Sequence, residues 1–364
     1  MSDKNINQDV EHQEKLNLKL YSEINSLNVV IAIIHFFFFW MLFLFASNYL
    51  EQNIIWYKAL IIFLSAFLLL FIASWLFSLP FRIWIYKISK ITGLLNQDFQ
   101  SWLVDWLKVL FLNLIFMVPV LSLMALIVYL NLNKSTFNLL ASFFIVLLLF
   151  IPVKTIQRFL AMSIIHGFER LKDGTKYHYW KTLLKQNQLK EYPIFILQIE
   201  KKASWSNALA FGIKNLGIIY TSDKMVNDLT EEQFAAVMAH ETAHLENNDI
   251  LKRISFSLLV IGFFLGMPLL FYLVPIQFFL FFTLLYLLIV LLLSFLSLLM
   301  VKHQEIKADI FSSKLLKSGK PLAEALDYLY TVNKIPKENR KNIITKHLKL
   351  YPDLNEHKYI LENS

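Results

Sequence analysis

The segment His240-Glu241-Thr242-Ala243-His244 has the spacing of a metal-binding helix. Residues four apart lie on one face of a helix, about one turn from each other, so two imidazoles at this spacing can bind one Zn²⁺ ion. The glutamate beside the first histidine can then take a proton from a water molecule at the metal. The pattern therefore predicts a hydrolytic zinc site with His240 and His244 as ligands and Glu241 as the general base.

The residues around this motif predict that it lies on a helix. Thr230 and Gln233 have the spacing of a capping box, with Thr230 as the N-cap. Apolar residues then recur at helical spacing at Phe234, Val237, Met238 and Leu245. No Gly or Pro follows before Gly262, so we expect the helix to run on without interruption.

A third ligand is expected downstream, because a catalytic zinc ion takes three protein ligands and keeps one position open for water. Glu305 is the candidate, and Asp309 follows one helical turn later on the same face. Asp309 could orient a zinc-bound histidine or donate a proton to the leaving amine. We expect one Zn²⁺ per chain. Two other carboxylates, Glu246 and Asp249, are expected to be solvated.

The composition is typical of an integral membrane protein, with 57% hydrophobic residues, 17% charged residues and 33 Phe. Six stretches are long enough to cross about 30 Å of hydrocarbon. They are Leu27–Leu50, Ala59–Leu79, Leu107–Leu130, Phe137–Val153, Ile254–Val274 and Ile276–Val301.

The basic residues predict the orientation of these spans. Arg82, Lys87 and Lys90 lie in the expected loop after the second span, and the long segment after the fourth span is rich in Lys and Arg. Both termini and the catalytic residues are therefore expected on the cytoplasmic side. Because two spans separate His244 from Glu305, the chain returns to the same face and the ligands can meet.

Charge and cysteine content narrow the expected partners and metal ligands. The chain has no Cys, which excludes a thiolate metal site. The net charge of +8 is spread over loops, which suits contact with anionic lipid and predicts no nucleic-acid partner. The Lys-, Asn- and Ile-rich composition indicates a bacterial source, so we expect the bacterial inner membrane and a lipid bilayer as partner.

The predicted fold is a mainly α integral membrane protein with about six transmembrane helices and a cytoplasmic α+β, zincin-like catalytic domain with a small β-sheet. Its predicted parts are an N-terminal arm (1–26), a four-helix membrane region (27–153), a cytoplasmic insertion (154–253), a transmembrane hairpin (254–301) and C-terminal catalytic helices (302–364).

The cytoplasmic insertion contains a helical start and then three predicted strands. Ile156–Gln186 is predicted to be helical. The strands are expected at Phe195–Ile199, Asn207–Phe211 and Gly217–Thr221. Asn207–Phe211 is either a sheet edge that binds an extended peptide or an ordinary strand.

With these motifs established, the chain resembles the integral-membrane zinc metalloproteases that include the type I CAAX prenyl endopeptidases and the HtpX proteases. The H-E-x-x-H motif and the later E-x-x-A-D motif, separated by a two-span hairpin, are similar to the signature of that superfamily. Further segments are similar to the CAAX prenyl branch: Leu79-Pro80-Phe81, residues 93–97, residues 105–108 and residues 201–208.

The resemblance implies that His240, His244 and Glu305 bind zinc and that Glu241 is the base. It also implies that Asn207 and Ala208 belong to the substrate-binding strand.

The chain departs from that family at several positions. Lys302 stands where the family has Arg three residues before the glutamate ligand. The family's C-terminal S-H-P-x-L-x-E-R element corresponds to residues 350–357 here, where Tyr351 stands in place of the expected His and His357 in place of the expected Arg. His347 could supply the missing imidazole. His347, Tyr351 and His357 are therefore the candidate donors for stabilising the transition state.

The predicted activity is that of a membrane-embedded zinc metalloendopeptidase that hydrolyses peptide bonds of membrane-associated or lipidated proteins. The alternative is an HtpX-like protease for membrane protein quality control. A non-catalytic zinc scaffold is disfavoured, because a structural zinc site has four protein ligands. A transporter is disfavoured because few ionisable residues lie within the spans.

Overall fold

The computed structural model describes residues 56–131, 160–260 and 276–334, together with positions within 23–34 and 153–157 and at 357 and 361. The chain divides into two compact units, Met1–Ile165 and His166–Ser364.

The described part of the first unit consists of two long helices, α2 (Trp56–Ile91) and α3 (Phe99–Asn131). They pack against each other, with the rings of Trp75 and Trp106 5.3 Å apart. Helix α2 runs through Pro80, so Arg82, Lys87 and Lys90 lie on the helix and the prediction of a loop there is wrong. Membrane helices tolerate proline, because nearby groups satisfy the carbonyl that the ring leaves without a donor.

Three helices among the described residues are long and apolar enough to cross a membrane: Leu68–Ile91, Phe99–Val120 and Leu280–Leu316. They correspond to the second, third and sixth predicted spans. The first, fourth and fifth predicted spans lie mostly outside the described residues. The chain is therefore mainly helical, as predicted, with the number of spans left as a prediction.

The second unit contains a small mixed sheet of four strands in the order β1-β2-β4-β3. The strands are β1 (Phe168–Leu171), β2 (Ile194–Leu197), β3 (Ala208–Phe211) and β4 (Ile218–Ser222). β2 and β4 are parallel, and the other neighbours are antiparallel. The three predicted strands are present, and β3 lies at an edge of the sheet.

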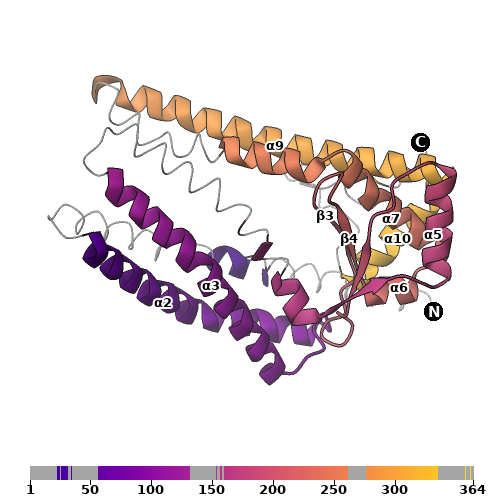
Figure 1. The fold of residues 1–364 in the computed structure, drawn as a ribbon, viewed down its shortest axis with the longest axis horizontal. Helices are drawn as coiled ribbons and strands as arrows, with labels where there is room; N and C mark the ends of the chain where they lie inside the picture. The colour runs from indigo at the N-terminus through magenta and orange to yellow at the C-terminus, as the bar shows by residue number, and fades with distance from the viewer. Residues whose placement is uncertain are drawn as a thin grey trace, which may run out of the picture. The chain divides into compact units, whose positions relative to one another are not determined.

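Strand β1 falls inside Ile156–Gln186, which was predicted to be helical, so that prediction is wrong there. The segment is interrupted at Gly167 and Gly174, which have φ angles of 68° and 105°. Glycine adopts these left-handed values without steric cost, and they are incompatible with a continuing right-handed helix. Residues 160–166 and the later helix α5 (Thr175–Gln186; Figure 1) are helical, as predicted.

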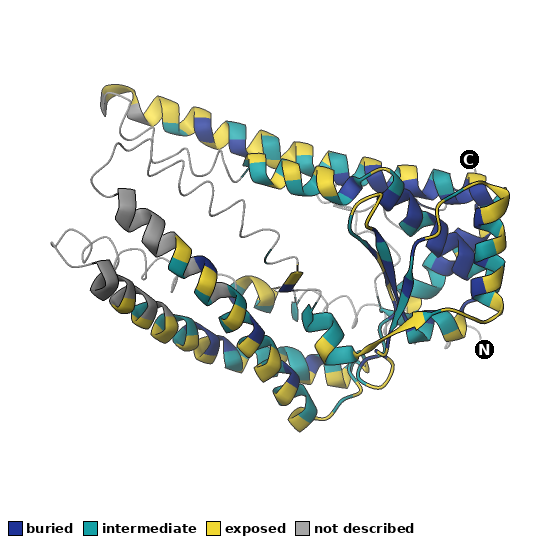
Figure 2. Ribbon diagram, in the orientation of Figure 1, coloured by how far each residue is buried: buried dark blue, intermediate teal, exposed yellow. Residues whose placement is uncertain are grey.

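Helix α7 (Glu231–Glu246) is the centre of the second unit. It packs against α5, β3, α9 (Phe279–Leu316) and α10 (Lys320–Val332). Phe234, Met238 and Leu245 on α7 are fully buried (Figure 2). Burying each such side chain contributes about 1.5–3 kcal/mol, so this packing fixes the position of the motif that α7 carries.

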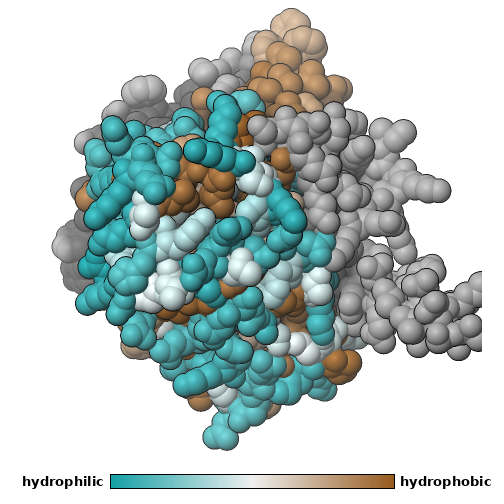
Figure 3. All heavy atoms as spheres, turned by 90° about the vertical axis from the view of Figure 1, so that its right-hand side faces the viewer, coloured by the Kyte–Doolittle hydropathy of each residue, from teal (hydrophilic) through white to brown (hydrophobic). Residues whose placement is uncertain are grey.

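Helix α9 has two different surfaces along its length. Its first half exposes large apolar side chains such as Leu280 (71%) and Leu291 (67%), whereas Ala308 and Asp309 in its second half are fully buried. The ribbon of α9 in Figure 2 is accordingly mostly coloured as exposed at its start and more often as buried toward its end. The face of the second unit that Figure 3 shows is instead mostly hydrophilic. This change marks where α9 passes from a long exposed apolar surface into the core of the second unit.

Candidate functional site

The capping box of α7 forms as predicted. The Gln233 backbone N–H donates to the Thr230 Oγ1 at 3.3 Å, and the Thr230 N–H donates to the Gln233 Oε1 at 3.1 Å. This arrangement satisfies two N–H groups at the helix start that have no partner within the helix. It fixes where α7 begins, and therefore which face carries the two histidines.

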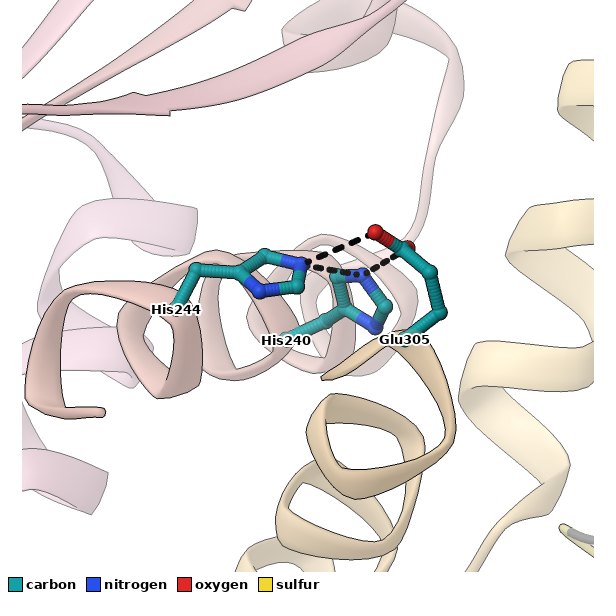
Figure 4. A group of neighbouring side chains, drawn as sticks. All are labelled: His240, His244 and Glu305. Atoms are coloured by element: carbon teal, nitrogen blue, oxygen red, sulfur yellow. Dashed lines mark hydrogen bonds and ion pairs between the residues drawn. The ribbon is translucent and has the colours of Figure 1, made fainter. Parts of the chain in front are cut away.

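Helices α7 and α9 bring His240, His244 and Glu305 together from positions more than sixty residues apart in the chain (Figure 4). The two histidine Nε2 atoms lie 3.2 Å apart. The Glu305 carboxylate lies 3.4 Å from the Nε2 of His240 and 3.7 Å from the Nε2 of His244. The three side chains thus point their donor atoms at one common position.

This geometry fits a zinc ion. With zinc–ligand bonds of about 2.0–2.1 Å, tetrahedral donor atoms lie about 3.3–3.4 Å apart. The closest approaches here are 3.2 Å between the two nitrogens, 3.4 Å from His240 to Glu305 Oε2 and 3.7 Å from His244 to Glu305 Oε1. With one donor atom taken from each residue, all three lie within 4.8 Å of one another, which is close enough for a single ion to bind them. Two imidazole nitrogens so close together can share either a proton or a metal ion between them.

Both histidines are oriented through their other ring nitrogen. The Nδ1 of His240 lies 2.9 Å from Asp309 Oδ1, and the Nδ1 of His244 lies 3.0 Å from Asp249 Oδ2. Asp309 is fully buried and Asp249 is 2% exposed. A carboxylate that accepts the Nδ1–H leaves the lone pair on Nε2, which is the tautomer that binds a metal.

The same contacts alter the acidity of the rings. Burial by itself lowers the pKa of His240, but hydrogen bonds to Asp309 and Glu305 outweigh it and hold that pKa well above its ordinary value. For His244, burial likewise lowers the pKa, and the contacts with Asp249 and Glu305 raise it overall. The site therefore attracts positive charge strongly.

Asp249 was expected to be solvated, and that prediction is wrong. Helix α7 ends at Glu246, and Asn248 adopts a left-handed conformation with φ of 52°. A second helix begins at residue 249. This break turns the Asp249 side chain back toward His244, which an uninterrupted helix would not allow because residues five apart point in different directions.

Glu246 was also expected to be solvated, and it is partly buried instead. Its Oε1 accepts a hydrogen bond from the Tyr192 hydroxyl at 2.6 Å, and its Oε2 lies 2.8 Å from the Lys214 Nζ. Glu246 therefore ties the end of α7 to the segment before β2 and to the loop between β3 and β4.

Arg253 was not identified from the sequence, yet it holds the third candidate ligand. Its Nη2 donates to Glu305 Oε1 at 2.8 Å, and its Nε donates to Gln304 Oε1 at 2.6 Å. A guanidinium can donate from two nitrogens in a fixed fork, so it constrains two successive side chains of α9 at once. No spacing rule in the sequence links residue 253 to residues 304 and 305.

The candidate base, Glu241, contacts the edge of the sheet. Its Oε2 accepts a hydrogen bond from the Ala210 N–H at 2.6 Å. Backbone groups of antiparallel strands alternate between the neighbouring strand and the open side, and in β3 those of Ala208 and Ala210 face the open side. The Ala208 N–H donates a hydrogen bond to Asn207 Oδ1 at 3.0 Å.

The remaining candidates divide into two groups. His357 is buried, and its Nδ1 makes a short contact with Asp309 Oδ2, so Asp309 bridges His357 and His240. His347 and Tyr351 lie outside the described residues. Lys302 lies on α9, one turn before Glu305.

The comparisons with known proteins agree with this geometry. Residues 178–350 match peptidase family M48. This segment is similar to an M48 peptidase domain over a little under half of the chain. The predicted relationship to the membrane zinc metalloproteases is thereby confirmed.

Solved structures extend the comparison to most of the chain. Eight solved chains match, including Ste24p of S. mikatae, with a TM-score of 0.66 and 23% identity over 86% of this chain and 77% of that one. The two proteins share a fold. No curated protein sequence matches the chain.

Proposed function

We propose that the protein is a zinc metalloendopeptidase that cleaves membrane-associated or lipidated proteins at a site formed by α7 and α9. The observation that carries this proposal is the convergence of His240, His244 and Glu305 beside Glu241, within the segment that matches peptidase family M48. Three protein donors leave a fourth position open for water, which is the arrangement of a catalytic zinc site.

The protein positions its own groups for hydrolysis. When bound, zinc polarises a carbonyl and lowers the pKa of water to about 7. Glu241 accepts the proton of the attacking water and passes it to the leaving amine. Asp309 accepts hydrogen bonds from two histidines, so the contacts support a role in orienting His240 rather than in donating a proton.

Substrate binding has to displace one existing contact. An extended peptide that adds to β3 would place a carbonyl oxygen opposite the Ala210 N–H. That N–H is held by Glu241 in this structure. The incoming carbonyl would take the N–H and release the Glu241 carboxylate toward the water, which couples binding to activation of the base.

The proposed location is a bacterial inner membrane with the catalytic site on the cytoplasmic side. The apolar helices and the shared fold with Ste24p support a membrane protease. A CAAX-like enzyme and an HtpX-like quality-control protease would differ in their substrates. Incubating the enzyme in detergent with a lipidated tail peptide and, separately, with an unfolded membrane protein distinguishes these substrates. Preferential cleavage of the unfolded protein would favour the HtpX-like alternative.

The decisive experiment on the chemistry replaces Glu241 by Gln. We expect Glu241→Gln to lower the cleavage rate by about 10²- to 10⁴-fold, because general-base catalysis contributes that much, while zinc content stays unchanged. Glu232→Gln is the matched control, since Glu232 lies exposed on the same helix. Undiminished cleavage by purified Glu241→Gln would refute the assignment of the base.

A further inference from the structure

The loop between β3 and β4 carries apolar side chains on the outside of the second unit. Leu216 is 78% exposed and Ile213 is 39% exposed. The Leu216 N–H donates to the Ile213 carbonyl at 2.9 Å, so the turn is closed by its own backbone. The two side chains therefore project from a defined turn instead of covering each other.

The loop is fixed to the start of the helix at residues 249–260. The Lys214 N–H donates to Asn248 Oδ1 at 2.9 Å, and the Lys214 Nζ pairs with Glu246 at 2.8 Å. The Lys190 Nζ donates to the carbonyl of Asn215 at 3.1 Å. The loop is thus held at the turn between α7 and that helix, and two lysines lie beside its apolar side chains.

That point lies close to the expected membrane surface. Asn248 precedes Ile254, where the predicted apolar stretch begins, by six residues, or about 9 Å along a helix. The headgroup layer on each side of a bilayer is about 5–8 Å thick. Arg253 also donates a hydrogen bond to Gln304, just after the apolar part of α9 ends. The apolar parts of α9 and of the helix at residues 249–260 therefore end at the same depth.

We propose that the loop of residues 212–217 contacts the lipid bilayer, with Leu216 and Ile213 entering the interface and Lys190, which is bonded to the loop carbonyls, placing its positive charge near lipid phosphates. This rests on the proposed membrane function. Two separate apolar side chains are far too small for a stable protein interface, which buries about 800 Å² per partner. Apolar side chains flanked by lysines instead fit a membrane interface.

The position of the loop links the proposed membrane contact to substrate binding. It directly follows β3, the proposed substrate-binding edge. An anchor at residues 212–217 would hold that edge at the membrane surface, where a membrane-attached substrate presents its first extended residues.

The absence of cysteine in the chain allows a direct test. Leu216→Cys in the full-length protein provides a single thiol for a nitroxide spin label. The labelled protein is reconstituted in vesicles of phosphatidylcholine and phosphatidylglycerol. Collision rates with oxygen, which partitions into lipid, and with a water-soluble nickel complex are then measured. Lys320→Cys on α10 is the matched control, because its side chain is 81% exposed.

We expect the label at position 216 to collide more often with oxygen than with nickel, and the label at position 320 to show the reverse. More frequent nickel collisions at 216 would place the loop in water, and exclusion of both reagents would place it against protein. Either result overturns the proposal. Ile213→Cys repeats the measurement if Leu216→Cys does not fold. The readout involves neither zinc nor cleavage, so a failed lipid contact in an active enzyme refutes only this inference.

Discussion

Removing the Asp249 carboxylate should weaken zinc binding although Asp249 does not contact the metal position. Asp249 Oδ2 holds the Nδ1–H of His244 at 3.0 Å, with both residues largely buried. In Asp249→Ala, the buried N–H of His244 loses its acceptor, and the ring is free to rotate or to change tautomer. Both changes remove the Nε2 lone pair from the metal position.

The structure sets the size of this effect. A hydrogen bond to a charged group contributes about 1.5–3 kcal/mol. At about 1.4 kcal/mol per factor of ten, this corresponds to roughly 10- to 100-fold weaker zinc binding. Asp249→Asn should have a smaller effect, because its amide oxygen can still accept the hydrogen bond without the charge.

The assay is a competition titration of zinc between the full-length protein in detergent and a chelator of known affinity. Lys252→Ala is the matched control, because Lys252 is the other partner of Asp249, at 3.5 Å, and its side chain is 55% exposed. The control should bind zinc with the affinity of the native protein. A zinc affinity of Asp249→Ala within twofold of the native protein would refute the role given to Asp249.

Two further predictions concern the contacts that surround Glu305 and Glu241. Arg253→Gln should weaken zinc binding about tenfold, because Glu305 loses the charged donor at 2.8 Å. Arg253→Lys should restore zinc binding only in part, since an ammonium lacks the two-nitrogen fork. Equal zinc affinities for the native protein and both variants would contradict this. Ala210→Pro should lower kcat/KM about tenfold and leave zinc content unchanged, because it removes the N–H of β3 that faces the open side of the sheet. An unchanged kcat/KM would exclude β3 as the substrate strand.

The sequence was sufficient for the parts of the site that depend on local rules. The Thr230 capping box and the helical spacing of His240 and His244 follow from chain geometry alone, and the structure contains both. The meeting of Glu305 with the histidines was predicted because an even number of spans separates them. The three strands before α7 were recognised from their apolar residues and turns.

The residues that were missed depend on backbone breaks and tertiary contacts. Asp249 reaches His244 because Asn248 adopts a left-handed conformation without a glycine to signal it. Strand β1 depends on two glycines in a segment that otherwise has helical character. Arg253 meets Glu305 only because two helices that are distant in the sequence pack side by side. None of these contacts leaves a periodic pattern that a sequence reading can use.

X-ray absorption at the zinc edge of the purified full-length protein tests the central claim most directly. Two imidazole nitrogens, one carboxylate oxygen and one water predict a shell of four light atoms at about 2.0–2.1 Å, with one zinc per chain. Glu305→Ala should lose one of these ligands and most of the bound zinc. A zinc environment that is unchanged in Glu305→Ala, or a native protein that binds no zinc, would contradict the account.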